Sequence, residues 1–189
     1  HLPATSVLYV AADVRSINRP VEYELNYTET GAADITLVRG RSYVRDGEVY
    51  TEAALVTQAT EQSLLTAGKQ YPQWVRRQYL DVPAEITQRT RDLAAAITAG
   101  KETPYEKAQA ITDWLRANIV YNNQRAAPPP GVEPVDNFLF DDREGYCNYY
   151  ASAMVILLRS LGIPARLAVG FAEGEYLPDS KVYRGRERD

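Results

Sequence analysis

The sequence predicts an α+β protein in which a β-rich N-terminal annex, residues 1–57, precedes a largely helical core, residues 58–189. Three observations predict this class. Residues 21–28 alternate apolar and polar side chains with the period of a strand. Apolar residues recur at helical spacing between positions 83 and 119. Residues 147–161 are apolar around nearly the whole circumference of a helix, which is typical of a helix buried inside a core.

The annex is predicted from strand and turn signals. In residues 21–28 one face of the strand should pack and the other should face water. Tyr43-Val44-Arg45 and Val49-Tyr50 flank Asp46-Gly47, a dipeptide that accepts the positive φ angles of a tight hairpin turn. We therefore expect a hairpin there and the end of the annex near Thr57.

Helical signals follow the annex. Short helices are predicted at residues 61–67 and 72–80. A third is predicted from Pro83 to Ala99, because proline favours a first turn and Gly100 a stop. Its apolar side consists of Ile86, Leu93 and Ile97.

The fourth helix has the clearest start. Thr103-Pro104-Tyr105-Glu106 combines a capping box with proline at the first helical position. We expect this helix to pack against the third one. Its apolar stripe consists of Ala108, Ile111, Leu115 and Ile119.

The last third of the chain contains a loop, a buried helix and a strand. Four prolines between Asn122 and Asp136 favour an extended, stiff loop. The apolar segment 147–161 is the buried helix, which Gly162-Ile163-Pro164 ends. Residues 166–171 are predicted to leave the core as a strand.

Composition excludes several classes of function. The 189 residues carry 21 Lys and Arg against 25 Asp and Glu, a formal net charge of −4. No general positive field therefore favours nucleic acid as a partner. The longest apolar run, residues 153–158, is too short to cross about 30 Å of hydrocarbon. One cysteine, Cys147, and one histidine, His1, form neither an internal disulfide nor a His/Cys metal set, so no metal or organic cofactor is implied.

Cys147 is the candidate nucleophile. It follows Gly145-Tyr146 and opens the predicted buried helix, where unpaired backbone N–H groups and the helix dipole favour a thiolate. The backbone N–H of Cys147 would also receive the negative oxygen that develops when a carbonyl carbon is attacked. We expect its side chain to be at least partly buried and to face a groove between this helix and a strand that starts near Ala165. The alternative is that the only cysteine is a small core hydrophobe.

The residues around Cys147 resemble a known family. Gly145–Met154 and Leu157–Arg166 are similar to the nucleophile helix of bacterial transglutaminase-like proteins and to the segment that follows it. The likeness extends over roughly residues 50–176. Upstream segments that resemble the membrane-anchored branch of the family are Tyr71-Pro72-Gln73-Trp74-Val75, Tyr79-Leu80, Thr103–Ala108 and Val135–Phe140.

The resemblance implies a fold, a chemistry and a location. The fold is a papain-like α+β core in which helices pack on a small antiparallel sheet. The Cys147 thiolate would attack a glutamine or peptide amide of a protein or peptide substrate and form a thioester, which an amine or water resolves. The core would lie outside the cytoplasmic membrane of a bacterium, anchored only through transmembrane segments absent from this chain.

The sequence departs from the family at the catalytic base. The family uses a histidine on a strand after the nucleophile helix, oriented by an Asp or Asn on the next strand. Residues 184–189 resemble the stretch that leads into that histidine, so we expect the base and its partner beyond residue 189. The core would then be incomplete at its C-terminal end and inactive by itself. His1 precedes the annex, matches no family motif and is more simply a tag remnant.

Other residues near Cys147 are weaker candidates. Tyr121, Tyr146 and Asn148 are candidate pocket residues, although a core position is the simpler interpretation of Tyr121. The loop carboxylates Asp136, Asp141 and Asp142 lack the spaced oxygen ligands and the glycine of a calcium loop, so we expect them to be solvated.

Two alternatives to acyl transfer stay open. Within enzymes, water instead of an amine would resolve the thioester, which would make the protein a cysteine protease or amidase. Outside enzymes, the fold would serve as a non-catalytic scaffold or peptide-binding module of a membrane protein.

Overall fold

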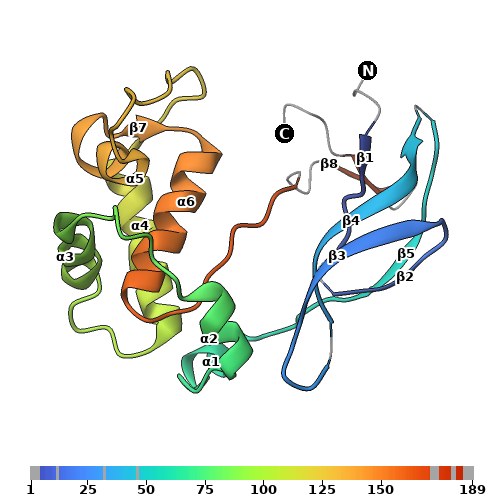
Figure 1. Ribbon diagram of the computed structural model, residues 1–189, viewed down its shortest axis with the longest axis horizontal. Coiled ribbons are helices and arrows are strands. Elements are labelled where there is room, and N and C mark those ends of the chain that lie inside the picture. Colours follow the sequence, from blue (N-terminus) through green and yellow to red (C-terminus); the bar gives the residue numbers. More distant parts are fainter. Residues whose placement is uncertain are drawn as a thin grey trace. The chain divides into compact units, whose positions relative to one another are not determined.

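The computed structural model describes residues 5–11, 13–31, 33–45, 47–170, 175–179 and 182–184. It combines small antiparallel sheets with packed helices, which confirms the predicted α+β class (Figure 1). Internal packing divides the chain into two units. The strand unit comprises residues 1–58 and 168–189, and the helical unit comprises residues 59–167.

Over its described residues, the strand unit contains three antiparallel sheets. Its strands are β1 (Thr5–Val7), β2 (Asp13–Ile17), β3 (Val21–Tyr27), β4 (Ala33–Val44), β5 (Glu52–Leu55), β8 (Glu175–Leu177) and β9 (Val182–Arg184). The first sheet has the order β1-β4-β3, and β2 pairs with β5. β8 and β9 pair with each other. A small apolar core is formed by Leu8, Val14 and Val38.

β3 confirms the strand predicted at residues 21–28. Val21 is half-buried and Glu22 is exposed, as an alternating strand requires. The pairing register shifts between Glu24 and Leu25, and Tyr23 is exposed although its position predicts the packed face. A register irregularity of this kind interrupts the simple in-and-out alternation of a strand.

The hairpin predicted around Asp46-Gly47 is wrong, although a turn is present there. Asp46 lies outside the described residues. Gly47 has φ of 80°, and the N–H of Glu48 donates to the carbonyl of Arg45 at 3.0 Å. The chain after the turn does not pair back on β4, because β1 and β3 already occupy the two edges of β4. It continues instead into β5, which pairs with β2.

The helical unit contains the five helices that the sequence predicts, together with a short helix at Pro134–Asp136 and a π-helical turn at Asn137–Asp141 that it does not predict. They are α1 (Glu61–Leu65), α2 (Gln73–Tyr79), α3 (Gln88–Ile97), α4 (Pro104–Asn118), α5 (Pro134–Asp136), the π-helical turn η1 (Asn137–Asp141) and α6 (Cys147–Ser160). The two-residue strands β6 (Val120–Tyr121) and β7 (Glu144–Gly145) pair in parallel.

α4 begins where its capping box predicts. The Thr103 hydroxyl accepts from the N–H of Glu106 at 3.2 Å, and the Glu106 carboxylate accepts from the N–H of Thr103 at 2.9 Å. These reciprocal bonds satisfy backbone donors that the helix itself cannot pair.

α3 begins at Gln88, not at Pro83 as predicted. Residues 83–86 form a turn in which the N–H of Ile86 donates to the carbonyl of Pro83 at 3.2 Å. Thr87 is the N-cap and accepts from the N–H of Thr90 at 3.3 Å. Proline suits a turn as well as a first helical position, so its presence alone does not fix the start of a helix.

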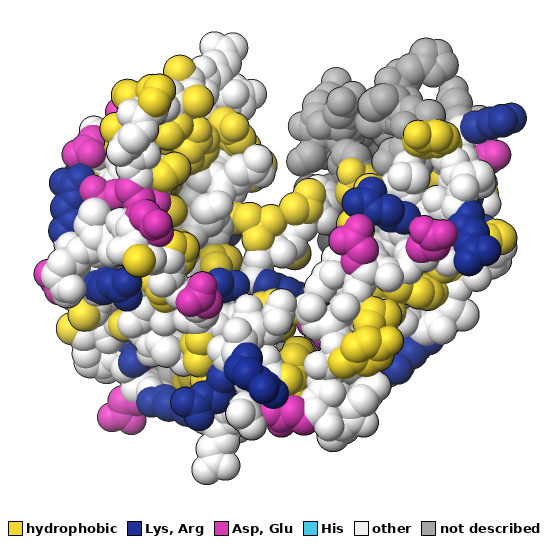
Figure 2. All heavy atoms as spheres, in the orientation of Figure 1, with side chains coloured by type: hydrophobic (Ala, Val, Ile, Leu, Met, Phe, Trp, Pro, Cys, Tyr) yellow, Lys and Arg dark blue, Asp and Glu magenta, His cyan; other side chains and the backbone are white. Residues whose placement is uncertain are grey.

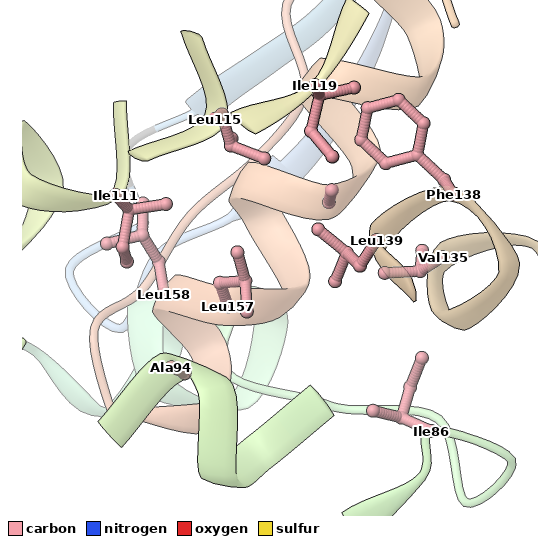
Figure 3. Close-up of a cluster of buried hydrophobic side chains, with 11 residues drawn as sticks. Ile86, Ala94, Ile111, Leu115, Ile119, Val135, Phe138, Leu139, Leu157 and Leu158 are labelled. Carbon is pink, nitrogen blue, oxygen red and sulfur yellow. The ribbon is translucent and has the colours of Figure 1, made fainter. Parts of the chain in front are cut away.

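The core of the helical unit lies around α6. Figure 3 shows the side chains of α4, the α5–η1 region and α3 directed toward this helix. Phe138, Ile111 and Leu157 are fully buried. Three of the four predicted stripe residues of α4 are buried in this core, namely Ile111, Leu115 and Ile119. The expected packing of α3 against α4 is also present.

The strand predicted at residues 166–171 is not present over its described part. Residues 163–170 belong to no strand, and Phe171 lies outside the described residues. The N–H of Ala165 donates instead to the carbonyl of Tyr79 at the end of α2, at 3.1 Å. An apolar run becomes a strand only where another strand pairs with it.

The surface carries charges of both signs. Figure 2 shows basic and acidic side chains interspersed on the face that it displays. Among the described residues, none of the helices has the length and apolarity that spanning a bilayer requires.

Candidate active site

Cys147 is the first residue of the 14-residue helix α6, which confirms its predicted position in a first turn. Tyr146, the N-cap, supplies no side-chain acceptor to that turn. The first N–H groups of a helix have no partner within the helix, so the turn presents donors beside the thiol. The predicted partial burial of Cys147 is wrong: its side chain is exposed.

The predicted groove between α6 and a strand near Ala165 is also wrong, because no strand forms there. Ala165 instead lies at the other end of α6, where its carbonyl accepts from the guanidinium of Arg159 at 2.9 Å. A helix rises 1.5 Å per residue, so roughly 18 Å of α6 separates Cys147 from Arg159.

The start of α6 is fixed by the short parallel ladder before it. Gly145 pairs with Tyr121, and its carbonyl accepts from the N–H of Asn122 at 2.8 Å. A Cβ at Gly145 would lie 3.0 Å from the Phe138 ring and 3.1 Å from the Cβ of Tyr149. A side chain at this position would force these neighbours to shift, so the close approach favours glycine directly before the helix.

Aromatic rings pack behind the first turn. The Tyr149 ring stacks on Phe138 at 5.8 Å between centroids, and the Tyr150 ring meets Phe138 edge-on at 5.2 Å. The Tyr150 hydroxyl donates to the carbonyl of Ile119 at 2.7 Å. Burial raises the pKa of Tyr150, and the nearby phenol of Tyr121 adds to the rise. Tyr150 therefore stays a neutral donor that ties α6 to the end of α4.

Arg125 is a buried cation beneath this cluster. Its guanidinium lies over the Tyr149 ring, 4.2 Å from the centroid, and donates to Asp142 and Asn137. Its Nε and Nη1 atoms are buried and have no hydrogen-bond partner among the described residues. The buried charge is therefore held by one carboxylate, one amide and one aromatic face.

A cavity of about 140 Å³ adjoins the start of α6. It is lined by Pro134, Val135, Tyr146, Asn148, Tyr149 and Ser152, none of which is charged. The thiol of Cys147 donates to the side-chain oxygen of Asn148 across 3.7 Å. Asn148 thus connects the sulfur atom to the rim of an uncharged cavity.

The structure brings the three predicted pocket residues to the start of α6. Tyr146 is the N-cap, Asn148 follows the cysteine, and Tyr121 pairs with Gly145. The Tyr121 ring lies 6.0 Å from that of Tyr150. Its interpretation as a core residue is wrong, because 64% of Tyr121 is exposed.

Asp136 differs from the solvated carboxylate that the sequence predicts. It is buried and accepts from Thr87, Thr90 and Arg89, the last at 2.9 Å from Nε. The Arg89 hydrogen bond lowers the pKa of Asp136 and outweighs the opposing effect of burial.

The other two loop acids are exposed, as predicted. Asp141 pairs with Arg89 and Asp142 pairs with Arg125. In the described part of the chain, no three His, Cys, Asp or Glu side chains are grouped so that they could hold a metal ion.

The sequence did not indicate Tyr149, Ser152 or Arg125 as parts of this site. Asn148, Tyr149 and Ser152 lie on one face of α6. Their helical spacing is the sequence feature that could have indicated Tyr149 and Ser152 as parts of the site. Arg125 lies in the proline-containing loop, where no periodicity indicates a buried contact.

Comparison with known proteins identifies the family. Residues 91–184, which include α6 and Cys147, match the model of the transglutaminase-like superfamily. The chain belongs, through this segment, to that superfamily. The family resemblance inferred from the sequence is therefore confirmed.

Two curated relatives of the transglutaminase-like chain are bacterial. One is the uncharacterized protein YebA of Bacillus subtilis strain 168, 40% identical over 100 residues, covering 52% of this chain and 14% of YebA. The other is a protein-glutamine gamma-glutamyltransferase of Pseudomonas aeruginosa strain PAO1, 32% identical over 130 residues, covering 64% of this chain and 19% of that protein. The chain thus spans less than a fifth of the length of either relative.

A solved structure confirms the transglutaminase-like fold. The periplasmic domain of TgpA from Pseudomonas aeruginosa matches with a TM-score of 0.64 and 22% identity, covering 95% of this chain and 56% of that one. The same domain bound to ethylmercury matches with the same TM-score, covering 97% and 60%.

Proposed function

We propose that this chain contributes the nucleophile of a transglutaminase-like acyl transfer, with the Cys147 thiolate as the attacking group. The observation that carries the proposal is the placement of Cys147 at the first residue of α6, inside the segment that matches the superfamily. An exposed sulfur beside unpaired backbone donors is accessible to a substrate and suited to stabilising negative charge.

The proposed reaction has two steps. The sulfur of Cys147 attacks the amide carbon of a glutamine side chain or peptide bond, while the backbone N–H of Cys147 receives the oxyanion. The C–N bond then breaks, the leaving nitrogen takes a proton, and a thioester remains. An amine or water attacks the thioester, the C–S bond breaks, and the sulfur returns to its starting state.

The proton for the leaving nitrogen requires an imidazole near the sulfur. The sequence contains one histidine, His1, which lies outside the described residues. We propose that the base and its orienting Asp or Asn come from sequence outside these 189 residues, and that the chain alone does not turn over.

The substrate is proposed to be a protein or peptide, with Tyr121, Tyr146 and Asn148 lining its path to the sulfur. Their position around the first turn of α6 supports this. We place the chain in an extracytoplasmic domain of a membrane-anchored bacterial protein. The support is its similarity to a periplasmic domain and to much longer bacterial proteins.

The test compares a longer protein that contains this chain with its Cys147→Ala variant and with the 189 residues alone. Casein as glutamine donor and dansylcadaverine as amine acceptor report transamidation. Ammonia release reports hydrolysis. We expect the longer protein to incorporate the amine and the other two chains to be inactive.

Each other outcome decides between the alternatives. Ammonia release without amine incorporation favours the protease or amidase. Absence of both activities in the longer protein favours the scaffold. Activity that survives in Cys147→Ala contradicts the assignment of the nucleophile.

A further inference from the structure

A second cavity lies at the end of α6 opposite Cys147, within the helical unit. Its volume of about 530 Å³ falls within the range of small-molecule sites, about 300–1,000 Å³. Four segments form it: the loop before α2, α2 with Leu80, the first turns of α4, and the residues after α6. The lining residues are Lys69, Gln70, Tyr71, Arg76, Leu80, Pro104, Lys107, Leu161, Gly162 and Ile163.

The charged lining of this cavity is entirely basic. Lys69, Arg76 and Lys107 are its charged residues, and no Asp or Glu lines it. Among the described residues none of these three cations forms an ion pair. Figure 2 shows Lys and Arg side chains in this part of the helical unit, around α1 and α2. On a chain with a net charge of −4, three cations around one hollow form a local positive field.

Glu106, the acid that precedes Lys107 on α4, does not line this cavity. The Glu106 carboxylate accepts from both the N–H and the hydroxyl of Thr103, at 2.9 and 2.8 Å. These bonds hold it against the N-terminus of α4 and lower the pKa of Glu106. The Glu106 carboxylate therefore stays ionised and is held at the helix cap, whereas Lys107 lines the cavity.

The rest of the lining is largely apolar. Leu80, Leu161 and Ile163 come from two different segments, and all three are half-buried. A bare inorganic ion would leave these apolar side chains in contact with water. A ligand with both an acidic group and an apolar body would use the whole lining.

We propose that this cavity binds a small organic anion, whose acidic group pairs with Lys69, Arg76 and Lys107 and whose apolar body packs on Leu80, Leu161 and Ile163. The proposal is independent of acyl transfer, because the site lies at the other end of α6 from Cys147. Paired charge and apolar contact define the ligand class: a carboxylate or phosphate ester with a short hydrocarbon or aromatic group.

Three probes separate the two parts of this recognition. Octyl phosphate, below its micellar concentration, carries both features; inorganic phosphate carries the charge alone, and octanol carries the chain alone. By calorimetry we expect octyl phosphate to bind at least ten-fold more tightly than either of the others. In ¹H–¹⁵N spectra its largest shifts should fall on residues 69–71 and 161–163. Affinity should fall as salt is raised, because these cations are near the surface.

Charge variants test the location of the site. Arg76→Glu should weaken octyl phosphate at least ten-fold, and Arg76→Gln, which keeps a polar side chain, about three-fold. Arg116→Glu is the matched control: the same change at an exposed arginine in the last turn of α4, outside the cavity. Circular dichroism checks that each variant is folded. Equal losses in Arg76→Glu and Arg116→Glu, equal affinities for octyl phosphate and inorganic phosphate, or shifts outside the lining would each overturn the proposal.

Discussion

The two ends of α6 differ in chemistry although one helix carries both. At the first turn, Cys147 adjoins an uncharged cavity backed by aromatic rings. Beyond the last turn, Leu161 and Ile163 line a larger cavity with three cations. The first end offers donors and a nucleophile to a neutral amide, and the second offers charge to an anion.

The two ends are also held in different ways. The first turn depends on buried polar contacts, because Asp136 and Arg125 anchor the segment that precedes it. The other end depends on the α4 cap and on the hydrogen bond from Ala165 to Tyr79. Between the ends, Leu157 is completely buried. Changes to the middle of the helix should therefore affect both ends, whereas changes near one end should affect that end alone.

The largest effect is expected in the middle. Leu157→Ala removes a fully buried side chain and should lower the free energy of unfolding by about 2–5 kcal/mol. Because both ends share this core, the change in the alkylation rate of Cys147 and the loss of octyl phosphate binding should both move to the same lower urea concentration. Urea unfolding followed by circular dichroism measures the change. Loss at one end only would show that α6 does not couple the two.

Asp136→Asn should lower the free energy of unfolding by about 1.5–3 kcal/mol at pH 7, because hydrogen bonds to a charged group near the Cys147 end of α6 are lost. The pKa of Asp136 is lowered in the folded protein. Its stabilising contribution is therefore present above the unfolded carboxyl pKa of about 3.9 and is lost as pH falls through the lower folded value. Urea unfolding of the original protein and of the Asp136→Asn variant should show a smaller difference in their free energies of unfolding at pH 3 than at pH 7. A difference in free energy of unfolding that stays constant with pH would contradict this role of Asp136.

Gly145→Ala should lower the free energy of unfolding by about 1–3 kcal/mol, because the new Cβ would lie 3.0 Å from the Phe138 ring and 3.1 Å from the Cβ of Tyr149. We expect the first turn of α6 to shift, so that alkylation of Cys147 changes more than octyl phosphate binding does. Gly162→Ala, at the other end of α6, is the comparison. There a Cβ meets no atom within 4 Å but φ is 74°, so strain arises without a clash. Equal effects of both changes on Cys147 would remove the distinction between the ends.

The smallest effect is expected from the α4 cap. Thr103→Ala removes the hydroxyl that caps α4 and should lower the free energy of unfolding by about 1 kcal/mol. The loss should reduce octyl phosphate affinity, because Pro104 and Lys107 line that cavity, and leave alkylation of Cys147 unchanged. Thr103→Ser, which retains the hydroxyl, should restore most of the stability. Thermal unfolding of the two variants gives the comparison.

Local rules explain what could be predicted from the sequence. The capping box located α4 to the residue, and the position of Cys147 after Gly145-Tyr146 located the first turn of α6. Both signals act within a few residues, so no distant contact is needed to interpret them.

The errors come from partners distant in the chain. The hairpin predicted at Gly47 does not form, because both edges of β4 are paired with other strands, β1 and β3. The strand at 166–171 lacks a partner over its described part, and Asp136 is buried by Arg89 and Thr90, which lie far from it in sequence. In each case the deciding contact carries no local pattern.

The central claim, that Cys147 carries the acyl group, is tested most directly by mass spectrometry. A longer protein containing this chain is mixed with a glutamine-containing peptide and quenched in acid within the first turnover. We predict that the proteolytic fragment with Cys147 gains the mass of the peptide less ammonia, and that hydroxylamine removes this mass. A protein that turns over the peptide while Cys147 stays unmodified, or that carries the acyl group on another residue, would contradict the account.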